Sequence, residues 1–230
     1  MAHTRLVALY DDCSMPAAVS AAAVDDDVFA LAETLIDSRR SVLPRHLVAP
    51  GPNRVQLDAL LRLAAAAPDH GLLTPWRFIE VPSSQRDRLA ETFAAALLDR
   101  DPAATPTEVA KARAKAYRAP LLLIAVACLG PRDPDIAPLE RMISMGAALQ
   151  NMLLGAHAMG FGAGLTGGQA LASPRMRALC ALADGEVAVC CVAFGTPTRR
   201  SLRAAPRPLP AQILSPLPAP AAVGSALSGA

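Results

Sequence analysis

Hydrophobic residues recur at helical spacing in several parts of the chain. In residues 26–40 they fall on one face behind a run of aspartates, which is the pattern of a capped amphipathic helix. The apolar positions of this face are Val28, Leu31, Leu35 and Ile36. A second amphipathic helix is predicted to begin after Asn53, because Gln56 has the spacing of a capping box, and to end at Pro68.

Two further helices are expected between residues 84 and 118. Residues 84–100 have the composition and spacing of a surface helix. Thr105, Pro106 and Glu108 then fit an N-cap, an N1 proline and an N3 acid. The helix that they begin should run to about Arg118.

The segment 138–160 is long and apolar on most of its faces, which predicts a helix that is covered all round. Gly160 is a natural residue to end it. A few strands cannot cover such a helix alone, so we expect a second subunit to help bury it. Ser173 and Pro174 have the pattern of a cap and first residue for a last short helix.

Continuous apolar runs predict three strands, which are residues 77–81, 120–128 and 186–194. The second run is short and opens with a proline, and both features favour a buried strand over a helix. With about five helices, the chain is a mixture of helices and strands whose core lies roughly between residues 26 and 200.

The two ends of the chain differ from this core. Residues 1–25 show no sustained period, and residues 201–230 are rich in Pro, Ala and Ser, which suits an extended or disordered tail. We therefore divide the chain into an N-terminal extension (1–25), one domain (26–200) and a C-terminal tail (201–230). A total of 230 residues suits a single domain with such appendages.

Composition and charge exclude several classes of protein. The 22 Lys and Arg nearly balance the 20 Asp and Glu, and no basic stripe with interleaved aromatics occurs, so we expect no nucleic-acid partner. The five cysteines have neither C-x-x-C nor zinc spacing, so we expect no metal site and no disulfide framework. No signal peptide and no apolar run of about 18 residues is recognisable, which predicts a cytoplasmic protein without a membrane partner.

The triplet Arg39, Arg40 and Ser41 lies at the predicted end of the first helix. Two guanidinium groups and a hydroxyl can bind a phosphate through charge-assisted hydrogen bonds. The same cations can instead complement the negative end of the helix dipole. The triplet alone leaves both interpretations open.

The stretch GAGLTG, residues 162–167, matches G-x-G-x-x-G, but it follows a predicted helix and does not open another. The context of a dinucleotide-binding fold is therefore missing, and so are the usual motifs of phosphoryl transfer, zinc hydrolysis and serine hydrolysis. We expect a glycine-rich loop that can lie close to a flat ligand. Taken singly, His70 is typical of a surface or core histidine and Trp76 of a core residue.

Taken together, the motifs resemble the nitroreductase family. LIDSRRS is followed by APDH and PWRF, then by RAPLLLIAVA, by the long apolar helix that leads into GFGAG, and by a strand ending in FGTP. The resemblance covers about residues 30–200 and is greatest to the small, single-domain bacterial branch of NAD(P)H nitroreductases.

The resemblance implies an α+β fold in which helices wrap an antiparallel sheet. It also implies an obligate homodimer that holds FMN at the subunit interface. In such a site Arg39, Arg40 and Ser41 would bind the phosphate and ribityl part of the flavin, and His70 would lie against the flavin.

The same resemblance implies that Leu165, Thr166 and Gly167 cover the cofactor and that residues 155–160 meet the nicotinamide nucleotide. NAD(P)H would reduce the flavin by hydride transfer and leave. A small electron-poor acceptor, such as a nitro compound or a quinone, would then be reduced in the same cleft in a ping-pong cycle. No side chain is needed as a general acid or base, because the cofactor carries the chemistry.

This chain departs from the family at several positions. The branch tends to have an arginine where Ala66 stands, and Trp-Arg-Ser at residues 165–167. The wider family prefers Asn and Gln where Leu72 and Thr74 stand. Several polar contacts to a flavin are therefore missing. Arg199, Arg200 or Arg203 could replace part of the lost positive charge, although these arginines are more typical of a solvated basic patch.

The missing contacts support a second hypothesis, a nitroreductase-fold protein that has lost FMN and acts as a binding or regulatory module. A third is an unrelated helical scaffold with surface arginines. A yellow purified protein with a flavin absorption spectrum would separate the enzyme from both. No site for a 2′-phosphate is recognisable, so the sequence does not choose between NADH and NADPH.

Overall fold

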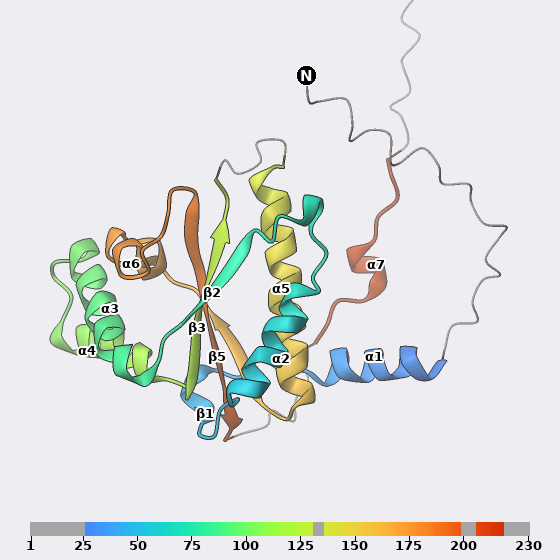
Figure 1. Ribbon diagram of the computed structural model, residues 1–230, viewed down its shortest axis with the longest axis horizontal. Helices are drawn as coiled ribbons and strands as arrows, with labels where there is room; N and C mark the ends of the chain where they lie inside the picture. Colours follow the sequence, from blue (N-terminus) through green and yellow to red (C-terminus); the bar gives the residue numbers. More distant parts are fainter. Residues whose placement is uncertain (1–25, 131–135, 199–205, 219–230) are drawn as a thin grey trace, which may run out of the picture. The chain divides into compact units, whose positions relative to one another are not determined.

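The computed structural model of the chain describes residues 26–130, 136–198 and 206–218. Residues up to Thr198 belong to one compact unit and residues from Arg199 to a second. In the first unit an antiparallel sheet lies between two groups of helices (Figure 1). This is the α+β architecture that the family resemblance implies.

Five strands form the sheet: β1 (Leu47–Val48), β2 (Trp76–Glu80), β3 (Leu121–Cys128), β4 (Gly162–Thr166) and β5 (Glu186–Pro197). Their order is β1-β5-β3-β2, with β4 also paired to β5, and every pair is antiparallel. The three predicted strands are β2, β3 and β5. The two-residue β1 was too short for its pattern to be recognised, and β4 was predicted to be a loop.

Helices cover both faces of the sheet (Figure 1). On one face α2 (Arg54–Ala65) and α5 (Pro138–Ala158) enclose a core that includes Leu60, Met152 and Phe194. On the other face lie α3 (Arg86–Arg100), α4 (Pro106–Ala114) and α6 (Pro174–Leu179), with Leu89 and Met176 in their core. Within the described residues, no helix is both long enough and apolar enough to cross a membrane.

The predicted helix starts are confirmed by their hydrogen bonds. The Asn53 side chain accepts from the Gln56 amide, and the Gln56 side chain accepts from the Asn53 amide, both at 2.9 Å. Thr105 and Glu108 form the same reciprocal pair at the start of α4. The helix expected to reach Arg118 ends as an α-helix at Ala114 and continues as a 3-10 turn over Lys115–Tyr117.

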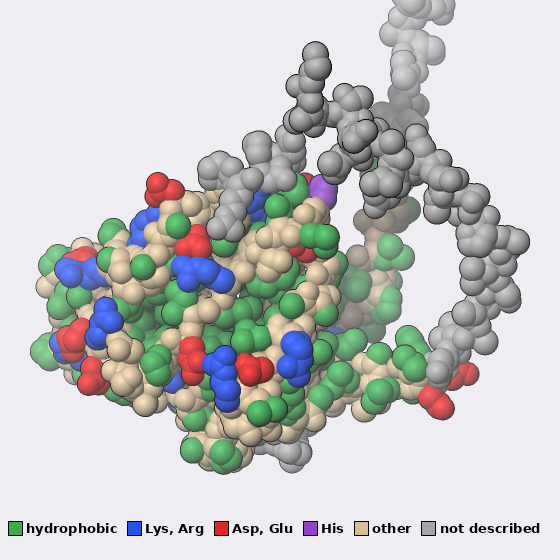
Figure 2. Space-filling view, viewed as in Figure 1, with side chains coloured by type: hydrophobic (Ala, Val, Ile, Leu, Met, Phe, Trp, Pro, Cys, Tyr) green, Lys and Arg blue, Asp and Glu red, His purple; other side chains and the backbone are tan. Residues whose placement is uncertain are grey.

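The first helix, α1 (Asp26–Ser38), has its predicted periodicity but buries none of its residues in this chain. Leu31 is 68% exposed, and Figure 2 shows the apolar side chains along this helix. A single chain does not cover α5 all round, because Leu139 and Ile143 are exposed, and its burial by a second subunit stays a prediction. Both helices therefore present exposed apolar residues in a single subunit.

In the second unit, residues 206–218 contain one four-residue helix, α7 (Pro210–Ile213). Composition had predicted an extended chain here. All of the described residues of this segment are exposed, so the helix has no core of its own. The predicted N-terminal extension lies outside the described residues.

The glycine-rich stretch 162–167 forms β4 because it packs against other backbone segments. Ser41 pairs with Ala163 in parallel, and the Val42 amide donates to the Ala163 carbonyl at 2.9 Å. A methyl group on Gly164 would collide with the Val42 carbonyl oxygen. Glycine is unfavourable in a strand but permits such a close approach, and this is why a loop was the wrong prediction.

We predict that Gly164→Ala lowers the free energy of unfolding by about 1–3 kcal/mol, the usual cost of forcing an extra carbon into a packed site. Urea denaturation measures the change. Gly146→Ala is the matched control, because Gly146 lies in α5 with open space at its Cβ position and alanine favours a helix. Equal stability of the two variants would contradict the close approach.

A partly buried ion pair joins two strands of the sheet. The Arg77 guanidinium on β2 donates two hydrogen bonds, of 2.7 and 2.8 Å, to the carboxylate of Glu186 on β5. These bonds, together with one from the Ala183 amide, outweigh burial and lower the pKa of Glu186 from 4.5 to about 2. The charged carboxylate is therefore the form that the folded state favours.

Because its pKa is depressed in the folded state, Glu186 should stabilise the protein fully above about pH 4.5, and the contribution should be lost as the pH falls towards 2. We predict that Glu186→Gln is less stable at pH 7 by about 2–3 kcal/mol and that its deficit narrows over this pH range. Urea denaturation at several pH values measures it. Glu91→Gln, which breaks the exposed pair with Arg113, should cost much less stability than Glu186→Gln, because water screens the exposed pair. A constant Glu186→Gln deficit from pH 7 to pH 2 would refute the assignment.

Candidate cofactor site

The triplet 39–41 follows the end of α1, and a side-chain hydrogen bond fixes this end. Ser38 Oγ and His157 Nε2, near the end of α5, are 2.8 Å apart. The chain then runs beside β4, where Ser41 pairs with Ala163. The triplet is therefore held between a helix end and the sheet.

The two arginines of the triplet have different surroundings. Arg40 donates to the carbonyls of Asp37 and Arg39, so it satisfies the end of α1, and the helix-end interpretation holds for this residue. The Arg39 guanidinium instead lies 3.4 Å from Ser41 Oγ. Arg39 and Ser41 thus bring a cation and a hydroxyl together at one place.

The structure brings the triplet 39–41 close to residues 165–167, which the family resemblance also assigns to the cofactor site. Ser41 pairs with β4 only two residues before Leu165, and Thr166 and Gly167 follow directly. A cavity of about 550 Å³ opens here, lined by Thr166, Gly167 and Pro44, while Leu165 does not line it. Pro44, three residues after Ser41, lines the cavity, whereas Arg39, Arg40 and Ser41 are not among its lining residues.

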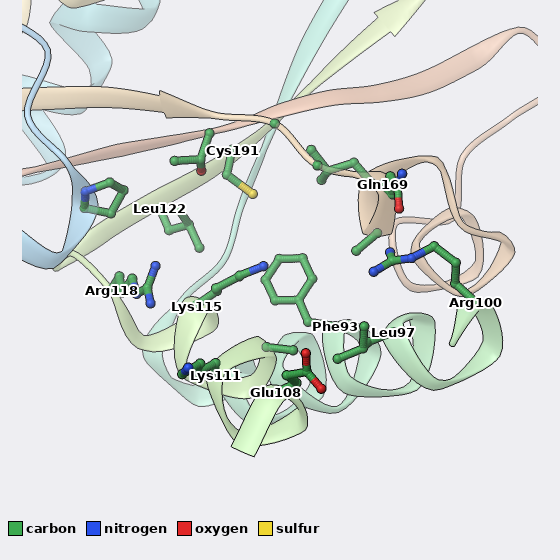
Figure 3. A pocket seen from close by; sticks show the side chains of 17 residues that line it. Phe93, Leu97, Arg100, Glu108, Lys111, Lys115, Arg118, Leu122, Gln169 and Cys191 are labelled. Atoms are coloured by element: carbon green, nitrogen blue, oxygen red, sulfur yellow. The ribbon is translucent and has the colours of Figure 1, made fainter. Parts of the chain in front are cut away.

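The cavity has an apolar wall and a cationic rim. The wall includes Phe93, Leu97, Leu122 and Leu171, from both helices and sheet. The Cys191 thiol also lines it, and burial raises the pKa of Cys191 to about 12, so the thiol stays protonated and is not a nucleophile. Four cations complete the lining: Arg100, Lys111, Lys115 and Arg118 (Figure 3).

The sequence analysis missed these four cations. Lys111, Lys115 and Arg118 recur at intervals of four and three residues in a predicted helix, which places them on one face, and this signal was available. Nothing in the sequence alone connects Arg100 with them. It meets them only because α3 and α4 pack together on the same face of the sheet.

His70 lies far from the triplet. Its Nδ1 is 2.8 Å from a carboxylate oxygen of Glu140, at the first turn of α5, whereas Ser38 contacts His157 in the last turn. These two contacts lie 17 residues apart on one helix, which corresponds to about 25 Å at 1.5 Å per residue. One subunit therefore does not bring His70 and Arg39 to the same ligand.

Three of the departures from the family pattern, Ala66, Leu72 and Thr74, lie close to His70 in the sequence. Ala66 is exposed at the end of α2, and Leu72 is 90% exposed. Gly71, Leu72 and Thr74 all have positive φ angles, of 69°, 54° and 45°. Such conformations are rare for non-glycine residues and mark a tightly wound surface loop.

The segment 155–160 begins with buried residues and ends with exposed ones. Gly155 is buried where α5 meets α2, and a methyl group there would collide with Leu63. Gly160 ends the helix with a φ of 85°, as predicted. Gly155 therefore allows α5 to pack closely against α2. The predicted contact with the nicotinamide nucleotide stays a prediction, and it concerns only the exposed residues of this segment. The arginines of residues 199–203 lie outside the described residues.

Comparison with known proteins places this arrangement in a family. The model of the nitroreductase family matches residues 36–196. A "Putative NAD(P)H nitroreductase" of Haemophilus influenzae is 34% identical over 128 residues, 56% of this chain and 67% of that protein. YdjA of Escherichia coli, which bears the same name, is 30% identical over 166 residues, 71% of this chain and 86% of its own.

One solved structure adds a cofactor to the comparison. The nitroreductase-type protein of Desulfovibrio desulfuricans, solved in complex with FMN, aligns with 81% of this chain and 96% of its own. The two share 25% sequence identity with a TM-score of 0.58. With the family model matching most of the chain, the resemblance of the motifs is confirmed: the chain belongs to the nitroreductase family.

Proposed function

We propose that this protein is a homodimeric, FMN-dependent enzyme that oxidises NAD(P)H and reduces a small electron-poor acceptor, such as a nitro compound or a quinone. Its family makes it an NAD(P)H-dependent oxidoreductase that uses FMN. The observation that carries the proposal is the pairing of Ser41, which Arg39 contacts, with β4, because the end of this strand leads into a cavity that Thr166 and Gly167 line.

The residues present fit such a cofactor. Arg39 and Ser41 offer a guanidinium and a hydroxyl to a phosphate, and a charge-assisted bond of this kind is worth about 1.5–3 kcal/mol. The apolar wall of the cavity suits a flat ring, and about 550 Å³ lies within the range of cofactor pockets. Arg40 would first have to leave the carbonyls that it now contacts.

When bound, FMN accepts a hydride from NAD(P)H and passes the electrons to the acceptor. The protein's part is to bind, to orient and to stabilise charge. Lys111 and Lys115 line the cavity as cations, so they would stabilise negative charge that develops within it. Thr166 and Gly167 would orient the ring, and the protonated Cys191 would supply apolar surface.

A homodimer would complete the site. His70 and Arg39 belong to opposite ends of α5, so a single flavin would meet both only if His70 came from the partner chain. The exposed apolar residues of α1 and α5 provide a surface for such a partner, because a monomer seldom leaves so large an apolar area in water.

The loss of FMN remains the alternative, since Ala66, Leu72 and Thr74 supply none of the polar groups that the family prefers. The cations that line the cavity favour an FMN-dependent enzyme over a protein that has lost FMN. Lys111, Lys115 and Arg118 provide positive charge at the cavity. The departures from the family pattern, such as Ala66 in place of an arginine, had suggested that positive charge was missing. A flavin absorption spectrum of the purified protein tests this choice directly.

We predict that Arg39→Ala weakens FMN binding by about ten- to a hundredfold, because it removes charge-assisted bonds worth about 1.5–3 kcal/mol. Arg39→Lys should restore only part of the affinity, because an ammonium does not reproduce the planar fork of a guanidinium. Titration of the apoprotein with FMN, followed by fluorescence quenching, measures both variants.

The control is Arg62→Ala, which removes the same charge from an exposed position on α2. It should leave the FMN affinity unchanged. If Arg39→Ala binds FMN as tightly as the wild type, Arg39 has only a helix-end role. In that case a stability change of about 0.3–1 kcal/mol is the only effect expected.

A further inference from the structure

Residues 86–118 contain seven cations, and they fall into two groups. Three point away from the cavity and have partners: Arg86 donates to the Ala116 carbonyl, Arg88 to Gln85 and Arg113 to Glu91. The other four, the rim cations named above, line the cavity and make no side-chain hydrogen bond or ion pair with any residue that the structure describes. The cations without partners are therefore the ones that face the cavity.

The acids of the same elements do not neutralise this rim. Glu91 and Asp99 pair with Arg113 and Arg175 on the outer surface. Glu108 is the one carboxylate among the lining residues, and both the backbone and the hydroxyl of Thr105 donate to it, which lowers its pKa. Four cations against this single carboxylate leave an excess of three positive charges. Like charges so placed repel one another unless an anion lies between them.

The cations are not equivalent in position. In Figure 3, Arg118 lies on one side of the cavity, and Arg100 and Gln169 lie on the opposite side. Pro44, which lies three residues after Ser41, also lines the cavity. Arg100 lies across the cavity from Arg118, and Leu97 forms apolar wall beside it.

We propose that Arg100, with Gln169 beside it, binds the anionic group of the electron acceptor. The acceptor class is then a nitroaromatic or quinone ring that carries a carboxylate or a sulfonate. The ring packs on the part of the apolar wall that Leu97 forms beside Arg100, and the anionic group meets the guanidinium, which can form a planar two-bond contact with it. This inference rests on the proposed function and narrows its acceptor.

The experiment compares two acceptors that differ in charge but little in shape, 4-nitrobenzoate and 4-nitrobenzamide. It measures kcat/KM for both with FMN-loaded wild type, Arg100→Gln and Arg88→Gln. Arg88 is the matched control, because it lies on the same helix, loses the same charge and does not line the cavity. Calorimetric titration with 4-nitrobenzoate, without NAD(P)H, measures the subsite independently of turnover.

The wild type should prefer 4-nitrobenzoate by about tenfold, and added salt should reduce the preference. Arg100→Gln should lower kcat/KM and calorimetric affinity for 4-nitrobenzoate by about tenfold and change 4-nitrobenzamide by less than about twofold. Arg88→Gln should change neither. Equal use of the two acceptors by the wild type, or an equal loss in both variants, would overturn the proposal.

A further measurement separates an acceptor subsite from a site for another anion, the 2′-phosphate of NADPH. If Arg100→Gln raises KM for NADPH but not for NADH, and leaves the acceptors unchanged, the subsite serves the nucleotide and the proposal is wrong. Failure to reduce either acceptor would refute the proposed function instead. The calorimetric comparison of wild type and Arg100→Gln would still decide whether the subsite binds the carboxylate.

Discussion

The backbone contact between the segment after α1 and strand β4 is the constraint on which the candidate site depends. It exists because Gly164 has no side chain, so that the Val42 backbone can lie against the strand. The contact places Ser41 beside Ala163 and carries Arg39 with it. Without it, the side chains that we propose to bind the phosphate and the strand end that lines the cavity would belong to separate parts of the surface.

Charge distribution gives this site its chemical character. Elsewhere among the described residues several arginines pair with carboxylates, as Arg113 does with Glu91. At the cavity, four cations stand beside an apolar wall without partners among the described residues. A cavity that combines unpaired cations with an apolar wall suits an anionic ligand. An FMN phosphate and an acidic acceptor are both consistent with such a cavity.

Local signals in the sequence predicted the fold well where a single segment carries the information. The capping pairs begun by Asn53 and Thr105 and the apolar strands were found because each depends on residues close in sequence. β4 was missed because its glycines are justified only by the distant Val42. The triplet and Thr166 were predicted as site residues by resemblance alone. Arg100 was missed because its role depends on how two helices pack on the sheet.

The central claim is that each cofactor site combines Arg39 of one subunit with His70 of the other, and a mixed dimer tests it most directly. Arg39→Ala and His70→Ala chains are co-expressed, and the flavin content is measured at an FMN concentration where each variant alone stays largely empty. If the site is shared, the mixed dimers regain one intact site, so about a quarter of all sites should fill when the chains assort randomly. If both residues served the same site within one subunit, or if the chain were a monomer, the mixture would bind no more FMN than the average of the two variants.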